Sequence, residues 1–216
     1  MPGLRALVDR WSVSDRSPSP VDRARIDAVL EENRVDLWTA VRRDAHQTAR
    51  FRGEHHRFRN GPDALVQVVR LCFVTDSFFA QVCYRARVAC RQRRIPLVPR
   101  LLHRLSVVTG QVSIGDLAVI RPGLYLPHGQ VVIDGMTLVE ENVSIRPFVT
   151  LGLVDGHIFG PSIGAGARIG TGAKVIGHVR IGPRAQVGAN AVVLGDVPEG
   201  ATAVGVPARV VDRPPT

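Results

Sequence analysis

The chain of 216 residues contains a single lysine, Lys174, yet its 28 lysines and arginines outnumber its 19 acidic residues and give a net charge of +9. Arginine therefore carries nearly all of the positive charge. The arginines are scattered, and no basic stripe is interleaved with aromatic residues, which make up only 5% of the chain. Because nucleic-acid surfaces need clustered positive charge, we do not expect nucleic-acid binding. An acidic carrier protein stays open as a partner.

Cysteine and long apolar runs are also scarce. The three cysteines, at positions 72, 83 and 90, are odd in number and lack the spacing of metal ligands, which predicts free thiols and no metal site. No uncharged apolar run approaches the roughly 18 residues that a membrane-spanning helix needs, so no membrane contact is expected. The opening segment MPGLRALVDRW carries charge where a signal peptide needs an apolar run. These absences predict a cytoplasmic protein.

The first half of the sequence predicts a mobile arm followed by helices. Serine and proline dominate the end of residues 1–21, which we expect to form the arm. Apolar residues recur at helical spacing in 22–50 and again in 63–94, and residues 100–106 predict a short last helix. Residues 22–106 are therefore expected to form an α-helical block that covers one end of the following domain and takes part in assembly.

Two polar residues in this block are expected to begin helices. Asp63 follows a Gly-Pro pair and is expected to be an N-cap, and Ser77 is expected to cap a second helical segment. The neighbouring His55 and His56 lie in a charged segment without a third metal ligand, which predicts a solvated loop.

From residue 114 to residue 193 the sequence repeats with a step of six. An aliphatic residue occupies the repeating position, at 114, 120, 126, 133, 139, 145, 151, 163, 169, 175, 181, 187 and 193. Glycine follows it at 115, 152, 164, 170, 182 and 188. A step of six is neither helical nor a plain strand alternation, and it is typical of short strands that stack, turn after turn, into a β-helix. We expect residues 107–211 to form this mainly β domain, with the aliphatic side chains inside.

One interruption of the repeat surrounds a histidine. The step from Leu126 to Ile133 is seven residues, so the turn Pro127–Gln130 holds one extra residue, and it contains His128. Irregularities of this kind in a regular sheet often mark functional positions.

A second interruption lies between Leu151 and Ile163, where His157 occupies the middle aliphatic position. Burying an imidazole there without a hydrogen-bond partner would be unfavourable. We therefore expect this stretch to leave the coil as a loop, with bends at Gly156 and Gly160.

The most specific part of the sequence is a set of four segments: VSIRPFVTLG (143–152), IGAGARIGTGAKVIGHVRIG (163–182), VGANAVVLGDVP (187–198) and AVGVPARVV (203–211). Together they resemble the hexapeptide acyltransferases, and most closely serine acetyltransferase and its relatives, over about residues 60–211. The resemblance implies a left-handed parallel β-helix of triangular section, preceded by an α-helical domain. It also implies a homotrimer or a dimer of trimers, with active sites between neighbouring subunits.

The resemblance assigns chemistry to His128. In this family the matching histidine is the general base, which takes the proton of an acceptor hydroxyl as the oxygen attacks the thioester carbonyl of acetyl-CoA. The family has an arginine before its second histidine, whereas Gly156 precedes His157 here, so a catalytic role for His157 is left open. Because the cysteines lie in the helical block, direct transfer is expected rather than an acyl-enzyme.

Acetyl-CoA is the implied co-substrate. Its pantetheine arm is expected in a groove between coils, along small or turn residues of the repeat, namely Thr150, Gly152, Ala165, Gly166, Ala173 and Ala203. Lys174 and Arg209 are expected to meet the nucleotide phosphates.

Several family residues that hold the base and the acceptor are missing. The family pairs its base with an aspartate 15 residues earlier, where this chain has Ser113, and it has an aspartate directly before the histidine, where this chain has Pro127. A carboxylate from elsewhere, such as Asp134 or Asp155, would have to stabilise the imidazolium formed during transfer.

The leading hypothesis is an acetyl-CoA-dependent O-acetyltransferase of serine acetyltransferase type, whose acceptor is serine or a similar small hydroxylated molecule held by Asp63 and Gln130. One alternative is acetylation of a sugar, a specialised metabolite or a substrate tethered to a carrier protein. Another is a non-catalytic trimeric scaffold. The short polar segment 212–216 predicts no stable complex with a cysteine synthase, since that complex uses a long tail ending in an aliphatic residue.

Overall fold

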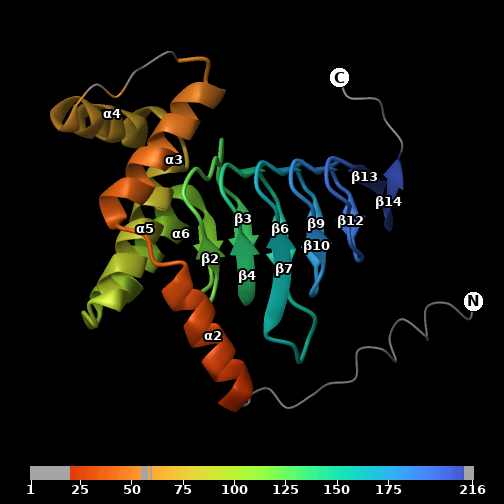
Figure 1. Ribbon diagram of the computed structural model, residues 1–216. Coiled ribbons are helices and arrows are strands. Elements are labelled where there is room, and N and C mark those ends of the chain that lie inside the picture. Colours follow the sequence, from red (N-terminus) through yellow and green to blue (C-terminus); the bar gives the residue numbers. More distant parts are fainter. Residues whose placement is uncertain (1–19, 55–57, 59, 212–216) are drawn as a thin grey trace, which may run out of the picture.

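The computed structural model describes residues 20–54, 58 and 60–211, so nearly all of the predicted arm, His55, His56 and the predicted tail lie outside the described residues. The described part begins with helices and continues into a coil of short strands (Figure 1). The helices are α2 (Pro20–Glu32), α3 (Leu37–Phe51), α4 (Gly61–Val74), α5 (Phe78–Gln92) and α6 (Val98–Gly110).

Helix boundaries differ from the sequence-based expectation where capping side chains act. The predicted helix 22–50 is two helices, because the carboxylate of Asp36 accepts a hydrogen bond from the backbone N–H of Thr39 (3.0 Å) and begins α3. Asp63 is not an N-cap, since Asn60 fills that role and accepts from the backbone N–H of Asp63 at 2.9 Å. The last helix, α6, extends to Gly110, beyond the predicted residue 106.

The strands form three sheets, one on each side of a coil. In chain order they are β1 (Val112–Ile114), β2 (Val119–Ile120), β3 (Val131–Ile133), β4 (Met136–Val139), β5 (Ser144–Ile145), β6 (Thr150–Gly152), β7 (Phe159–Ile163), β8 (Arg168–Ile169), β9 (Lys174–Ile176), β10 (Arg180–Ile181), β11 (Gln186–Val187), β12 (Val192–Val193), β13 (Thr202–Gly205) and β14 (Ala208–Val211). The strand orders are β1-β3-β6-β9-β12, β2-β4-β7-β10 and β5-β8-β11-β13-β14. All pairs are parallel except the closing hairpin β13–β14. Each sheet therefore takes one strand from each successive turn, as the repeat predicts.

The repeating aliphatic residues form the core of the coil, which confirms their predicted position. Ile133, Leu151, Val175 and Val193 stack in register on one sheet and are almost completely buried. A glycine after the aliphatic leaves space for the next turn of backbone. A Cβ on Gly164, for example, would lie 2.5 Å from the backbone nitrogen of Pro183.

The helical block covers the end of the coil that begins at β1 (Figure 1). Backbone carbonyls of the first turn have no preceding strand to pair with, and side chains from α5 and α6 donate to them instead. These contacts run from Tyr84 to Ala118 (3.1 Å), from Arg87 to Ile114 (2.6 Å), from Arg91 to Asp116 (2.9 Å) and from Ser106 to Val112 (2.9 Å). The block thereby satisfies backbone acceptors that would otherwise be exposed or unpaired.

A buried ion pair ties α3 and α5 to the coil. The carboxylate of Asp44 accepts from Arg85 (2.8 Å) and from the backbone N–H groups of Gly123 (2.7 Å) and Leu124 (3.0 Å). Arg85 also donates to the carbonyl of Ile120. Burial raises the cost of both charges, and these hydrogen bonds offset it.

Candidate active site

The turn that contains His128 is held against the end of α6. A Cβ on Gly129 would lie 1.7 Å from the carbonyl oxygen of Gly110, so only glycine fits. Gln130 has a positive φ of 63°, which is uncommon for a residue with a side chain. The extra residue predicted in this turn is therefore accommodated by backbone geometry, and it leaves the His128 side chain 62% exposed.

His128 is paired with a carboxylate that sequence reasoning did not identify. Its Nδ1 lies 2.7 Å from Oδ2 of Asp76, which belongs to the connection between α4 and α5. The two residues are 52 positions apart, and no motif in the sequence links them. Only the packing of the helical block on the first turn of the coil brings them together.

The two carboxylates that the sequence offered as substitutes are not beside His128. Asp134 follows β3, whereas His128 precedes it, and its Oδ1 accepts from the backbone N–H of Gly135 at 2.7 Å. Asp155 is exposed in the loop after β6. Ser113, at the family's aspartate position, lines a separate cavity with Arg87 and His103.

His157 lies in a loop that leaves the coil after β6, as predicted, and its side chain is exposed. Its backbone N–H donates to the carbonyl oxygen of Val154 at 3.0 Å. Gly156 is at a bend with a φ of 83°, but Gly160 is not at a bend. Instead it lies within β7, where a Cβ would be 2.3 Å from Oγ1 of Thr137.

The two candidate catalytic histidines are at opposite ends of one sheet. His128 precedes β3, and His157 follows β6, which pairs in parallel with β3 through Ile133 and Leu151. Parallel strands bring their amino ends together and their carboxyl ends together. A single chain therefore does not bring His128 and His157 into one site.

The predicted acetyl-CoA residues are only partly available to a ligand. The side chains of Ala173 and Ala203 belong to the buried core, so a pantetheine arm could contact these residues only through their backbone atoms. They occupy the interior corner of the repeat, where a small side chain is required. Ala165 and Gly166 form a turn in which Ala165 is exposed and Gly166 is half-buried, with a φ of 69° at Gly166.

The remaining predicted ligand contacts lie on the paired strands β6 and β9 and on the β14 hairpin. Thr150 and Gly152 lie on β6, and a Cβ on Gly152 would be 3.0 Å from Cδ1 of Ile176. Nζ of Lys174 donates to the carbonyl of Phe148 at 2.6 Å. Arg209 is exposed on the β14 hairpin. Thr150 and Lys174 are direct partners on β6 and β9, Gly152 is buried, and Arg209 belongs to a different sheet, so the four residues do not share one surface of a single chain.

Of the two predicted acceptor contacts, only Gln130 is near His128. Asp63 lies in the first turn of α4, roughly 16 Å by the rise per residue from the end of that helix that leads to Asp76. Within one chain, Asp63 therefore does not approach the His128 turn.

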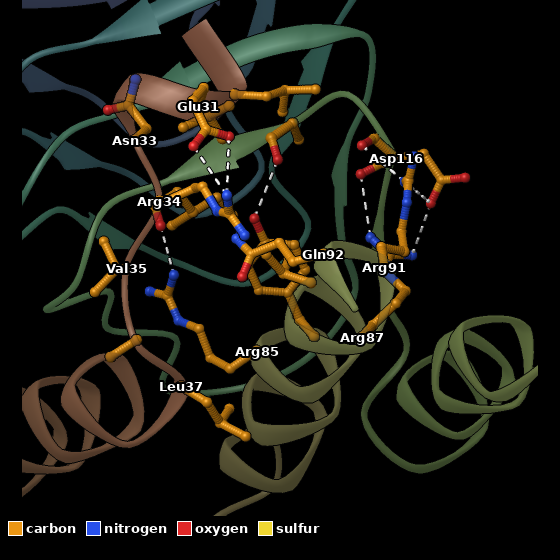
Figure 2. Close-up of a pocket in the computed structure, with 18 of the residues that line it drawn as sticks. Glu31, Asn33, Arg34, Val35, Leu37, Arg85, Arg87, Arg91, Gln92 and Asp116 are labelled. Carbon is orange, nitrogen blue, oxygen red and sulfur yellow. Dashed lines mark hydrogen bonds and ion pairs between the residues drawn. The ribbon is translucent and has the colours of Figure 1, made fainter. Parts of the chain in front are cut away.

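A cavity of about 490 Å³ lies between the α2–α3 connection, α5 and the first turn of the coil (Figure 2). Arg34 pairs with Glu31 on one side of it, and Arg91 pairs with Asp116 on the other. Burial lowers the pKa of the Arg87 guanidinium, which donates to backbone carbonyls of the coil. His128 and Asp76 do not line this cavity. Its Arg91–Asp116 pair connects the helical block to the coil, whereas the Arg34–Glu31 pair lies within the helical block.

The described residues contain no metal-binding group, and two of the three cysteines are disfavoured as nucleophiles. No three His, Cys, Asp or Glu side chains in this part of the chain are grouped to hold a metal ion. Burial raises the pKa of the Cys72 and Cys83 thiols, which disfavours the nucleophilic thiolate. No helix formed by the described residues is long and apolar enough to cross a bilayer.

Known proteins resemble this chain in sequence and in structure. The family "Bacterial transferase hexapeptide (six repeats)" matches residues 160–195. A serine acetyltransferase of Helicobacter pylori is 38% identical over 138 residues, which cover 62% of this chain and 80% of the relative. The chain belongs to the serine acetyltransferase family.

Two further comparisons agree with this assignment. A serine acetyltransferase of Synechococcus elongatus is 38% identical over 159 residues, which cover 72% of this chain but only 62% of the relative. A solved serine acetyltransferase in complex with CoA superposes with a TM-score of 0.66 at 28% identity, covering 92% of this chain and 79% of that one. The coil is thus the left-handed β-helix of hexapeptide-repeat acyltransferases, preceded by a helical domain.

Proposed function

We propose that this serine acetyltransferase family member moves an acetyl group from acetyl-CoA to the hydroxyl of serine or a similar small acceptor, with His128 as general base. The observation that carries the proposal is the 2.7 Å contact between His128 in the irregular turn of the coil and Asp76 in the α4–α5 connection. Because a carboxylate accepts hydrogen bonds, Nδ1 carries the proton and Nε2 keeps its lone pair. An exposed imidazole with a free Nε2 is the group that acceptor deprotonation requires.

The reaction follows from that tautomer. Nε2 takes the hydroxyl proton while the oxygen attacks the thioester carbonyl, and the new carbon–oxygen bond gives a tetrahedral oxyanion. When the carbon–sulfur bond breaks, the CoA sulfur receives the proton from Nε2 and leaves as the thiol. Backbone N–H groups at turns are suitable oxyanion donors. No protein nucleophile is needed, which agrees with the raised thiol pKa of Cys72 and Cys83.

Free serine is a weaker candidate acceptor than the family name implies. Pro127 lacks the charge that an adjacent aspartate would offer to an ammonium, and Gly156 cannot bind a carboxylate through a side chain. An acceptor with fewer charged groups, such as a sugar or a carrier-tethered hydroxyl, is therefore a second candidate. The net charge of +9 favours an acidic carrier over a neutral one.

A homotrimer is part of the proposal, because the two histidines are at opposite ends of a sheet and His128 is exposed in one chain. A neighbouring subunit can bring its own His157 loop to His128. A wider assembly of two trimers is supported by exposed apolar side chains on α4, namely Leu65, Val66, Val69 and Phe73. A cytoplasmic location and the absence of a cysteine-synthase complex stay predictions.

A screen of thiol release from acetyl-CoA tests the function. Wild type, His128→Ala and the matched control His178→Ala, which removes another exposed histidine of the coil, are compared with serine, homoserine, sugars and carrier-bound serine. Turnover that needs His128 but not His178, with at least one acceptor, is expected. If His128→Ala equals wild type in turnover with every acceptor, His128 is not the general base. If wild type shows no turnover with any acceptor, the scaffold alternative is favoured.

A further inference from the structure

We infer that Asp76 of the helical block is the positioning residue for His128. It takes the place of the family's coil aspartate, whose position is occupied by Ser113 in this chain. The inference rests on the proposed function of His128 and adds a residue from a different domain to it. Its consequence is that the fit between the helical block and the coil sets the orientation of the catalytic base.

The geometry selects one imidazole tautomer. Oδ2 of Asp76 lies 2.7 Å from Nδ1 of His128, a distance typical of a charge-assisted hydrogen bond. The bond fixes the ring orientation and leaves Nε2 as the acceptor. Asp76 is the only charged group in an ion pair with His128 among the described residues. The imidazolium formed during transfer therefore has this carboxylate as its counter-charge.

A buried anchor holds the two residues in place. Ser77, next to Asp76, is completely buried, and its hydroxyl donates to the carbonyl of Leu126, two residues before His128. Ser77 begins α5 but makes no side-chain capping bond. Its predicted capping role is taken by Thr75, whose hydroxyl accepts from the backbone N–H of Phe78 at 3.3 Å. The Ser77 hydroxyl is thereby available to join the α4–α5 connection to the catalytic turn.

The pair itself has little structural value. The side chains of Asp76 and His128 are 73% and 62% exposed, and exposed ion pairs contribute little to stability. The fold between these elements is held by Ser77 and by the close approach of Gly129 to Gly110, which do not need the Asp76 carboxylate. Removing that carboxylate is therefore expected to change the base and leave the fold intact.

Three variants separate this role from a structural one. Asp76→Asn removes the negative charge at constant shape, Asp76→Glu keeps the charge, and Glu32→Gln removes one exposed negative charge from α2 as a matched control. We expect kcat to fall by roughly 10–100-fold in Asp76→Asn, the usual effect of losing a histidine's supporting partner. Asp76→Glu should recover part of this loss. The control should have the kcat of wild type. In the Asp76 variants KM for acetyl-CoA should change by less than about twofold, because Asp76 contacts the imidazole and not the donor.

One further readout, the tautomer of the His128 ring, does not depend on the stability of the fold. Nitrogen-15 NMR of the His128 ring should show the Nδ1–H tautomer in wild type and a mixture in Asp76→Asn. Melting temperatures of all variants report whether the fold is retained.

The outcomes keep the two proposals apart. An active wild type, with Asp76→Asn equal to it in kcat and ring tautomer, would overturn the Asp76 inference and leave the His128 function standing. If wild type has no turnover with any acceptor, the proposed function fails, and the tautomer comparison still decides whether Asp76 orients the ring. An equal loss in Asp76→Asn and Asp76→Glu with an unchanged tautomer would also reject the positioning role.

Discussion

At the scale of single residues, the proposed chemistry depends on one imidazole in an irregular turn. Replacing His128 by Ala is expected to lower turnover by roughly 10²–10⁴, the usual contribution of a general base. Acetyl-CoA binding should change little, since Nε2 of His128 is proposed to contact the acceptor hydroxyl and not the donor. A thiol-release assay measures turnover, and isothermal titration calorimetry with CoA measures binding of the donor. A large loss of CoA affinity would show that His128 contacts the donor instead.

Gly129 makes a second residue-scale prediction, because its missing side chain lets the catalytic turn approach α6. The Cβ of Gly129→Ala would lie 1.7 Å from the carbonyl oxygen of Gly110, and backbone cannot move aside cheaply. A displacement of about 1 Å at His128 would lower kcat by up to about 10²-fold. The matched control is Gly195→Ala, since a Cβ there meets nothing within 4 Å. Similar activity of the two alanine variants would contradict the close packing of the turn.

At the scale of elements, the buried Asp44–Arg85 pair joins α3, α5 and the first turn of the coil. Replacing Asp44 by Ala leaves Arg85 charged and buried, and it also removes the acceptor for the backbone N–H groups of Gly123 and Leu124. We expect a loss of roughly 3–5 kcal/mol in the free energy of unfolding, measured by urea titration.

The exposed pair between Arg43 and Glu141 provides the control for this measurement. Glu141→Gln should change the free energy of unfolding by less than about 1 kcal/mol, because solvent screens both charges. A loss as small as this in Asp44→Ala would mean that the helical block does not depend on the buried pair.

The junction between α3 and α4 gives a prediction about pH. Arg70 and Arg52 hold the pKa of Glu54 down at about 2, against an ordinary value of 4.5. Because the folded-state pKa is the lower one, the stabilisation is complete above about pH 4.5 and is lost as the pH falls toward 2. Glu54→Gln should therefore destabilise the fold by about 1 kcal/mol at pH 7.

Urea titrations of wild type and Glu54→Gln at pH 7 and pH 3.5 measure this dependence, since about pH 3.5 lies inside the expected window. The difference between the two proteins should shrink at the lower pH. Glu31→Gln, which removes an exposed partner of Arg34, should show no such change. A difference that is constant with pH would exclude the Glu54 ion pairs as its source.

At the scale of the whole molecule, assembly is expected to complete the active site. Light scattering should find a trimer or a multiple of it at working concentration. If His128 and His157 of different chains share a site, a mixture of His128→Ala and His157→Ala chains assembled together should regain about one quarter of wild-type activity, because random assembly leaves that share of interfaces intact. A monomer, or a mixture no more active than its parents, would contradict the shared site.

The coil could be predicted from the sequence because its repeat is a local property. A step of six residues specifies strand, turn and interior position at the same time, so the interior aliphatics, the irregular turn at His128 and the loop at His157 could all be found without knowing the fold. Small residues were harder to interpret. Ala173 and Ala203 could lie in a ligand groove or at an interior corner, and the repeat alone does not distinguish the two.

Tertiary structure decided everything that depends on the contact between the helical block and the coil. The donors to the first-turn carbonyls, such as Tyr84 and Arg87, have no periodic signal, because they bind unpaired backbone groups that occur only at the end of the coil. The same holds for Asp76, which lies 52 positions before His128 and reaches it only because Ser77 is anchored on Leu126. The sequence determined the coil and the identity of the candidate base through short-range pattern. Which carboxylate faces that base was decided by the packing of two domains, which no local pattern encodes.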